Sequence, residues 1–376
     1  MFLALGDKET CLLGQRYQSL FRHRFIQFSQ MTFMMLPLVR RFRSRTVSLQ
    51  DLPHYAAKVV VLAPEETSER PAALSLPGQF DRVRDVQPAT TPDYERARLT
   101  RGEVRHVPTC AFLLRNVSYL NGTVHAGSMR LPQVQESPLK SRQPTQHLPL
   151  AALPSSLVGS RFFGHHLVDD SATMLLAAEF APAFRAPAAA VETWPHAAAY
   201  RKRMGVEAPV LCNARVAEAW LFQDWGMTAH RRTRLERLRQ QLRDSPGPRA
   251  GHGVFLRRRG AGAARVLANE EELERILERM GFDIVDPSSD SADLVIARCR
   301  DARVVVGVEG SGLAHGFLGC APDATFVVLQ HPYQFNNVWK DFTDALGMRY
   351  AFLVGEGSRE CFRVDPDELK ATLDLL

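Results

Sequence analysis

The chain contains the stretch Arg303-Val304-Val305-Val306-Gly307-Val308-Glu309-Gly310-Ser311-Gly312-Leu313-Ala314-His315. Its β-branched residues favour a strand, and the residues from Leu313 onward favour a helix. Gly310 and Gly312 permit positive φ angles or a close approach of the backbone. Free N–H groups in such a turn, with the positive end of the following helix, can face an anion. The stretch therefore predicts either a site for a phosphate-bearing ligand or a plain chain reversal between a sheet and its covering helix.

The turn fits neither of two common nucleotide-binding patterns. No Gly-Lys-Ser/Thr follows it, so the Walker pattern is absent. Nothing matches the third glycine of the dinucleotide fingerprint either. The sequence therefore argues against ATP hydrolysis and against hydride transfer.

Strand and helix signals alternate on both sides of this stretch. Asn269 is positioned to cap a helix with an acidic first turn, and Gly281 is positioned to end it. Strands are predicted at 254–256, 282–285, 303–308 and 325–329, and helices at 270–280, 291–299 and 313–318. This order predicts an open, mainly parallel α/β sheet. Ligands bind such sheets at the carboxyl ends of the strands, where the glycine turn would lie.

The first half of the chain carries weaker signals. Residues 58–62 predict the first strand, so we expect folded sequence to begin near residue 55. Asn121-Gly122 predicts a hairpin within a region, 115–154, of short strands and long loops. Helices are predicted around 174–180 and 234–243. The predicted organisation is an N-terminal extension (1–54), a first domain (55–244), a linker (245–252) and a second domain (253–376).

Length and composition indicate a folded protein of two domains. The chain has 376 residues, of which 45% are hydrophobic and 23% charged. Its six cysteines form no Cys-x-x-Cys pair and have no histidine at zinc spacing. We therefore expect a reducing compartment and no structural metal.

The net charge of +6 is concentrated near the N-terminus. Residues 11–49 hold arginines and many apolar side chains but no acidic residue. Peripheral membrane contact through residues 12–50 is one interpretation. The alternatives are a disordered extension or a later start at Met34 or Met35, which would leave 1–33 untranslated. The longest apolar run is too short to span a membrane, no secretory signal is evident, and no nucleic-acid recognition module accompanies the arginines.

Polar groups that could carry chemistry fall into three clusters. The first is the glycine turn with its flanking Glu309 and His315. The second is basic and follows the strand at 254–256; its members are Arg257, Arg258, Arg259 and Arg265. Guanidinium groups there suit a diphosphate, although a solvated basic loop is the alternative. The third is His165 with Asp169, for which a helix cap or an interdomain hydrogen bond is the alternative.

Together these clusters resemble a known family. Three motifs carry the resemblance, in the order Phe163-Gly164-His165 with Asp169, then Phe255-Leu256-Arg257-Arg258 leading to Arg265 and Asn269-Glu270, then 304–313. Together they look like bacterial members of glycosyltransferase family 61. The likeness spans roughly residues 55–355. It implies a GT-B-type α/β fold, in which two Rossmann-like domains face a central cleft. It also implies an inverting hexosyl- or pentosyltransferase of surface or capsular polysaccharide assembly, cytoplasmic or peripheral to the inner membrane.

The resemblance implies roles for single residues. Asp169 is predicted to be the base, oriented or assisted by His165, with Asp170 as the nearest rival. The predicted donor-binding residues are Arg257, Arg258, Arg265, Asn269, Glu309, Gly310, Ser311, Gly312 and His315. Many members have His-Gly-Ala-Gly at the turn, whereas this chain has Glu309-Gly310-Ser311-Gly312. Glu309 is therefore expected to accept hydrogen bonds from a ribose or sugar hydroxyl, with the imidazole supplied by His315.

The implied partners are a nucleotide sugar, with UDP the favoured nucleotide, and a carbohydrate or glycolipid acceptor, without a metal and without nucleic acid. Two other functions fit the same residues. A sugar-nucleotide epimerase would use a similar diphosphate site without a separate acceptor. A binding protein would keep the scaffold with a degenerate sugar site.

Overall fold

The structure is a computed structural model that describes residues 45–135, 146–244, 251–259 and 265–376. Residues 46–376 form one compact unit, which holds a five-stranded and a seven-stranded sheet. The basic extension up to residue 44 and residues 245–250 of the predicted linker lie outside the described residues. None of the described helices is both long enough and apolar enough to cross a membrane.

The five-stranded sheet is parallel throughout, in the order β12-β10-β13-β14-β15. Its strands are β10 (Gly253–Leu256), β12 (Phe282–Val285), β13 (Val304–Val308), β14 (Thr325–Gln330) and β15 (Arg349–Val354). The chain moves from β10 to one side and then returns past it to β13. This is a doubly wound order, and its topological switch point lies between the carboxyl ends of β10 and β13. The predicted parallel α/β sheet is confirmed.

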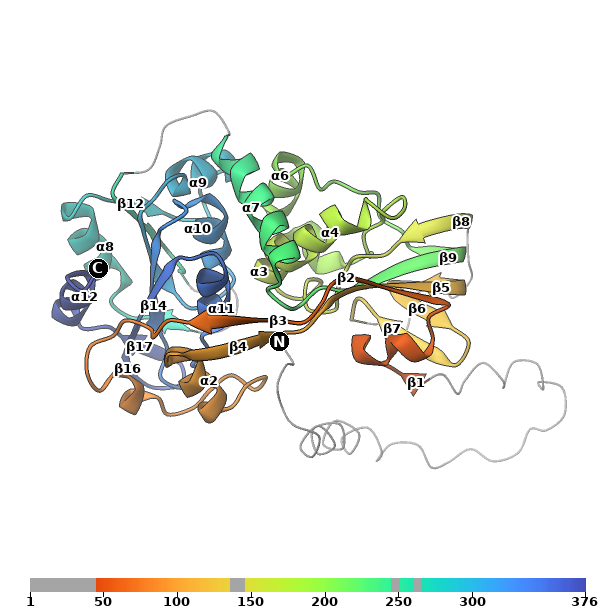
Figure 1. The fold of residues 1–376 in the computed structure, drawn as a ribbon. Coiled ribbons are helices and arrows are strands. Elements are labelled where there is room, and N and C mark those ends of the chain that lie inside the picture. Colours follow the sequence, from red (N-terminus) through yellow and green to blue (C-terminus); the bar gives the residue numbers. More distant parts are fainter. Residues whose placement is uncertain (1–44, 136–145, 245–250, 260–264) are drawn as a thin grey trace, which may run out of the picture. The chain divides into compact units, whose positions relative to one another are not determined.

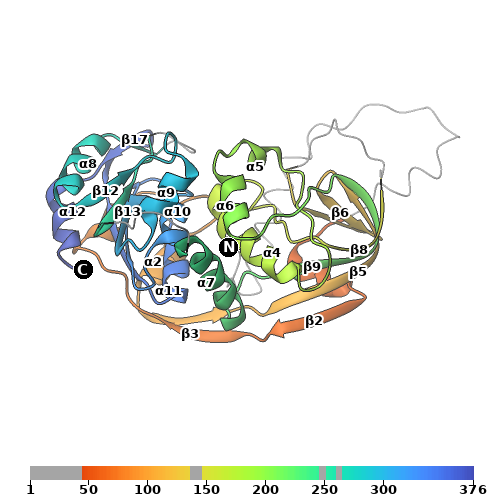
Figure 2. The ribbon, with the colours of Figure 1, turned by 90° about the horizontal axis from the view of Figure 1, so that it is seen from above.

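Helices cover both faces of this sheet (Figures 1 and 2). One face carries α8 (Glu270–Arg279) and α12 (Pro366–Leu373), and the other carries α9 (Ala292–Cys299), α10 (Leu313–Gly319) and α11 (Val338–Ala345). Successive side chains of β13 alternate between two cores. Val306 packs in the core that contains Leu273 of α8, and Val305 packs in the core that contains Phe317 of α10. Burial on both faces explains why this strand is a continuous apolar run.

Two predicted helix boundaries are confirmed, and one capping prediction is wrong. Gly281 follows α8 with φ +85°, as expected for a residue that ends a helix in the left-handed region. The hydroxyl of Ser291 caps α9 by accepting from the backbone N–H of Leu294. The Asn269 side chain does not cap α8. Its amide instead exchanges hydrogen bonds with the backbone of Val364, which ties α8 to the segment after β17 (Cys361–Arg363).

The seven-stranded sheet is mostly antiparallel, in the order β1-β7-β6-β5-β9-β8, with β2 also paired to β5. Its strands are β1 (Arg45–Thr46), β2 (Lys58–Ala63), β5 (Thr109–Leu120), β6 (Thr123–Ala126), β7 (Met129–Pro132), β8 (His147–Ala152) and β9 (Asn213–Gln223). Within it only β8 and β9 pair in parallel among the described pairs. The first half therefore differs from the Rossmann-like arrangement implied by the resemblance.

The long strand β5 and an early helical turn also differ from expectation. β5 spans 12 residues where short strands were predicted, because β2 pairs with its first part and β6 with its last. Asn121 and Gly122 have φ angles of 48° and 82°, so the predicted hairpin turn is confirmed. Ordered structure begins before residue 55. The turn η2 (Leu49–His54) is held by a Ser48–Asp51 capping box and buries Leu52 completely.

The remaining helices of the first half lie between the two sheets. They are the continuous helical segment α3 (Phe163–His165), η4 (His166–Asp170) and α4 (Ser171–Ala177), followed by α5 (Ala189–Thr193), α6 (Ala197–Arg203) and α7 (Ala229–Arg243). The middle piece, η4, is a π-helical turn, a rare geometry that is frequent at functional sites. Leu175 of α4, Leu238 of α7 and Phe317 of α10 belong to one hydrophobic core. The two halves are therefore packed together directly.

An early segment of the chain crosses to the C-terminal sheet. It comprises β3 (Glu66–Arg70), η3 (Gln79–Arg82), α2 (Pro92–Leu99) and β4 (Gly102–His106), and Figure 1 shows β3 and β4 as a two-stranded ribbon. Arg98 donates to Asp341 of α11 at 2.6 Å, and Lys340 Nζ donates to the carbonyl oxygen of Pro71 at 2.8 Å.

The third sheet joins β11 (Val266–Leu267), β17 (Cys361–Arg363) and β16 (Glu356–Gly357).

Candidate active site

The candidate site begins at the switch point of the parallel sheet. Arg257 and Arg258 follow β10 directly, and the turn from Glu309 to Gly312 follows β13. Gly310 has φ +142°, a conformation that side-chain-bearing residues rarely adopt. A Cβ at that position would also collide with the Arg258 guanidinium. Glycine is thus required here for the backbone angle, and its lack of a side chain also leaves room for the Arg258 guanidinium.

Two of the predicted arginines converge on the turn. Arg258 Nη1 and Arg265 Nη1 donate to the carbonyl oxygen of Glu309 at 3.1 Å and 2.7 Å. Arg265 also forms an ion pair with the Glu309 carboxylate, and its Nε donates to Gln334 Oε1 at 2.9 Å. Burial lowers the pKa of Arg258, and the neighbouring charge of Arg265 lowers it further. Two guanidinium groups therefore stand side by side at the carboxyl ends of β10 and β13.

The carboxylate of Glu309 is buried and lies on the interior side of these arginines. Glu309 is only 3% exposed, and its Oε2 also accepts a hydrogen bond from Gln87 Nε2 at 3.0 Å. Burial raises the pKa of Glu309, while the charges of Arg265 and Arg258 act in the opposite direction. The sequence predicted that Glu309 would accept from a sugar hydroxyl. The structure instead pairs it with Arg265.

Two other predicted donor-binding residues lie apart from this pair. Arg257 forms an ion pair with Glu274 of α8, and its Nη1 lies 4.0 Å from an oxygen of Asp286. Asn269 is held by the backbone of Val364. Both residues therefore support the loop after β10 and the neighbouring α8, and neither joins Arg258 and Arg265 at the turn.

His165 and Asp169 form the predicted pair, and they lie one turn apart on a helical segment that begins before the predicted helix at 174–180. His165 Nδ1 is 2.6 Å from Asp169 Oδ2, and the other carboxylate oxygen forms an ion pair with Arg231 of α7. Burial would raise the pKa of Asp169. The charge of Arg231 and the hydrogen bond from His165 outweigh it and lower that pKa to about 2. Asp169 is thus a buried, permanently ionised carboxylate that accepts from both neighbours.

The ionised state of Asp169 fixes the tautomer of His165. A carboxylate can only accept, so His165 Nδ1 carries the hydrogen and donates it. In the neutral imidazole, Nε2 is then the atom with the free lone pair. The side chain of His165 remains 24% exposed, whereas that of Asp169 is 9% exposed. The basic atom is therefore Nε2 of this partly exposed side chain, and Asp169 orients it.

The helical segment and the glycine turn meet directly. A Cβ added at Gly164 would lie 3.2 Å from Ser311 Cα, so a larger residue there would push the two segments apart by a few tenths of an ångström. The rings of Phe163 and His315 lie 5.0 Å apart between centroids. This contact places the His165–Asp169 pair beside the turn that Arg258 and Arg265 surround.

His315 lies at the junction as a neutral structural group. It is 3% exposed, and burial lowers its pKa to about 3, with a smaller contribution from His196. Its Nδ1 lies 2.8 Å from the hydroxyl of Tyr200, which is itself completely buried. An imidazole in this setting carries no positive charge at neutral pH. His315 therefore joins α10 to α6, which differs from its predicted contact with the ligand.

Asp170 gives a prediction about stability and pH. Burial raises the pKa of this carboxyl group from its ordinary 3.8 to about 8, despite hydrogen bonds from Ser156. Between these values the folded state keeps the proton and the unfolded state releases it, so wild-type stability falls as pH rises, by at most about 1.4 kcal/mol per unit. Asp170→Asn has no such titration, and its amide oxygen can still accept from Ser156.

We therefore expect Asp170→Asn to become more stable relative to wild type with each step from pH 4 to pH 8. Urea unfolding at several pH values measures this difference. Asp374→Asn, at an exposed position near the C-terminus, is the matched control and should show no trend. A constant difference between Asp170→Asn and wild type would show that Asp170 ionises normally in the folded protein.

Several residues of the site carried no sequence signal. Arg231 lies in the arginine-rich helix α7, and nothing in the sequence marks it as buried, yet it is 1% exposed. Gln87 and Gln334 come from loops far away in the sequence. His331, directly after β14, is completely buried; its Nδ1 accepts from the backbone N–H of Tyr333, and its Nε2 has no hydrogen-bond partner among the described residues. For His331, the position directly after a parallel strand was the one signal in the sequence that could have indicated a place near the site.

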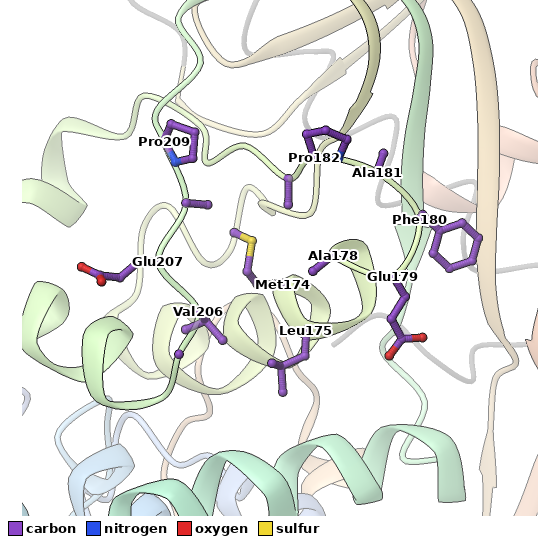
Figure 3. Close-up of a pocket in the computed structure, with 13 residues that line it drawn as sticks. Met174, Leu175, Ala178, Glu179, Phe180, Ala181, Pro182, Val206, Glu207 and Pro209 are labelled. Carbon is purple, nitrogen blue, oxygen red and sulfur yellow. The ribbon is translucent and has the colours of Figure 1, made fainter.

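A separate pocket of about 520 Å³ opens beyond the carboxyl end of α4 (Figure 3). Met174, Leu175 and Val206 give it apolar walls, and Glu179 and Glu207 add carboxylates. None of the predicted site residues lines it. Among the described residues there is also no group of three histidine, cysteine or acidic side chains that could hold a metal ion.

Comparison with protein families identifies a match in the middle of the chain. The family described as Glycosyltransferase 61 matches residues 130–328, which is more than half of the chain. The matched range contains the helical segment with His165, the arginines after β10 and the glycine turn after β13. No curated protein matches the chain.

Proposed function

Because this chain belongs to the glycosyltransferase 61 family, a membership that implies sugar transfer, we propose that it is an inverting transferase acting from a nucleotide-sugar donor. The acceptor is a carbohydrate or glycolipid. The observation that carries the proposal is the contact of Gly164 with Ser311. This contact brings the partly exposed imidazole of His165 beside the guanidinium groups of Arg258 and Arg265. A base next to a diphosphate site is what such a transfer requires.

The donor diphosphate binds at the switch point of the parallel sheet. Arg258 and Arg265 provide guanidinium forks that match phosphate oxygens and stay charged at every relevant pH. The backbone N–H groups of Ser311 and Gly312 approach the same place, because Gly310 turns the chain there. Positive charge at this point stabilises the nucleoside diphosphate as it leaves. Nothing in this arrangement calls for Glu309 to touch the sugar, since its carboxylate holds Arg265.

The acceptor is activated by His165. Its Nε2 takes the proton of the acceptor hydroxyl while that oxygen forms a bond to the anomeric carbon on the face opposite the diphosphate. The bond from the anomeric carbon to the diphosphate oxygen breaks, and the nucleoside diphosphate leaves with the electron pair. Asp169 holds the imidazole in the required tautomer and stabilises its protonated form. These roles reverse the order predicted from the sequence, in which Asp169 was the base.

The two substrates are assigned to the two halves of the chain. We assign the acceptor to residues 55–244 and the donor to residues 253–376, in an arrangement of GT-B type of which only the second half is Rossmann-like. The doubly wound sheet supports the donor side of this proposal, and the helical segment with His165 supports the acceptor side. Three further parts of the proposal rest on the family resemblance alone. They are UDP as the nucleotide, metal-independent transfer, and a place in bacterial surface or capsular polysaccharide assembly at the inner membrane.

Thermal denaturation with a panel of nucleoside diphosphates and nucleotide sugars tests the proposal. A ligand that binds the folded state raises Tm by mass action. We expect one nucleoside diphosphate and its sugars to raise Tm, and Arg258→Gln to weaken that binding by about 10- to 100-fold, the loss of a charge-assisted hydrogen bond to phosphate.

Arg279→Gln is the matched control, because it removes one charge at the far end of α8. Its nucleotide affinity should equal that of wild type. The proposed donor site is wrong if no member of the panel raises the wild-type Tm, or if Arg258→Gln binds nucleotide as well as the control does.

A further inference from the structure

Phe162 is exposed at the beginning of the helical segment. It is 47% exposed, whereas the next residue, Phe163, packs against Trp194 and His315. A single exposed aromatic side chain is ordinary on a protein surface. This one is set apart by its position, because it immediately precedes the contact between Gly164 and the glycine turn.

The Phe162 ring stands beside the proposed base. The ring centroids of Phe162 and His165 are 6.0 Å apart, with an angle of 64° between the ring planes. An aromatic face attracts the C–H groups of a pyranose ring, because its π-electrons are negative and those C–H groups form the apolar side of the sugar. A sugar stacked on Phe162 would therefore present hydroxyl groups next to the imidazole.

Arg161 adds a positive charge at the same place. Its guanidinium carbon lies 5.5 Å from the centroid of the Phe162 ring. Unlike Arg231 and Arg265, which are paired with carboxylates, Arg161 is exposed and forms no ion pair with any other described residue. An accessible guanidinium held over the ring of a stacking side chain matches a carboxylate carried by a stacked sugar.

We propose that Phe162 and Arg161 form the acceptor subsite and that this subsite takes an acidic pyranoside, a sugar ring that bears a carboxylate. Phe162 supplies the surface on which the ring stacks, and Arg161 selects the carboxylate. The inference rests on the proposed function, because the stacked sugar is the acceptor whose hydroxyl His165 deprotonates.

Two small glycosides that differ only at C6 test the subsite. Methyl β-D-glucuronide carries a carboxylate there, and methyl β-D-glucoside carries a hydroxymethyl group. Saturation-transfer NMR titrations with wild type should give about a two- to fivefold tighter Kd for the glucuronide, as expected for an exposed ion pair. Arg161→Gln should remove this preference. Phe162→Ala should weaken both glycosides by about tenfold, through the apolar contact that it loses.

Control measurements separate this subsite from the donor site. Arg303→Gln, which removes an exposed arginine at the opposite end of β13, should behave as wild type with both glycosides. Nucleotide-induced Tm shifts should be unchanged in Arg161→Gln and Phe162→Ala. The subsite is overturned if wild type binds neither glycoside, if Phe162→Ala binds both as tightly as wild type, or if Arg161→Gln keeps the preference. Glycoside binding that depends on both residues, without any nucleotide-induced shift in wild type, would keep the sugar site but reject the transferase and, with it, the acceptor role of that site.

Discussion

Replacement of His165 by alanine is expected to lower kcat by about 10²- to 10⁴-fold, the usual contribution of a positioned general base. The affinity for the donor nucleotide should stay at the wild-type value, because Arg258 and Arg265, the proposed donor-binding residues, lie on the other side of the junction. The substitution removes a side chain that is 24% exposed, so the fold should tolerate it. Steady-state kinetics at saturating donor, combined with nucleotide-induced Tm shifts, measures both quantities.

Asp169→Asn distinguishes the two candidate bases. If His165 is the base and Asp169 orients it, either single substitution removes most of the activity. The double variant should then be no slower than His165→Ala alone, because residues that act as a unit are not additive. If Asp169 were the base, His165→Ala would keep far more activity than Asp169→Asn. Because the pKa of Asp169 is about 2, any acidic limb in kcat/KM above pH 4 would belong to another group.

The parallel sheet was predictable because each of its elements carries a local signal. Short apolar runs such as 304–308 are buried on both faces, and a left-handed glycine such as Gly281 ends the helix between two of them. Hydrophobic runs and glycines act within a few residues, so the sequence displays them directly. The same holds for the Asn121-Gly122 hairpin, in which both residues adopt positive φ.

The path of residues 66–106 could not be predicted in this way. Its contacts join residues that are far apart in sequence, for instance Arg98 with Asp341 and Gln87 with Glu309. Each such partner is one of many polar side chains of the same kind, and no local pattern selects it. The segment nevertheless carries Gln87 to the glycine turn, so part of the site depends on a connection that the sequence does not display.

The site itself shows the same division. The resemblance paired His165 with Asp169 without predicting a helix there, and the glycines and Arg258 marked the switch point. The roles within the pair depend on Arg231, which approaches Asp169 from α7. Its buried charge lowers the pKa of the carboxyl group and so makes Asp169 the orienting member. A residue 62 positions away thus changes the role that the resemblance implied for Asp169.

Arg265→Met is expected to destabilise the protein by about 3–5 kcal/mol, because it leaves the buried Glu309 carboxylate without its partner. Glu309 is 3% exposed and Arg265 is 8% exposed, so water cannot replace the lost interaction. The remaining neighbours of the carboxylate, Gln87 and Arg258, do not form the direct ion pair that Arg265 supplies. Urea unfolding at pH 7 measures the loss as a shift in the midpoint with an unchanged slope.

A second substitution identifies the cause of that loss. Arg265→Met combined with Glu309→Gln removes the buried charge, keeps an amide oxygen for Gln87, and should recover much of the stability. In the single variant, burial without Arg265 raises the Glu309 pKa further above its ordinary value of 4.5, so its stability should fall as pH rises from 5 to 8. The double variant should lack this slope. Arg363→Met, which breaks an exposed pair with Glu272, should cost about 0–1 kcal/mol. Equal losses in the single and double variants would mean that Arg265 stabilises the turn through the Glu309 carbonyl oxygen rather than through its carboxylate.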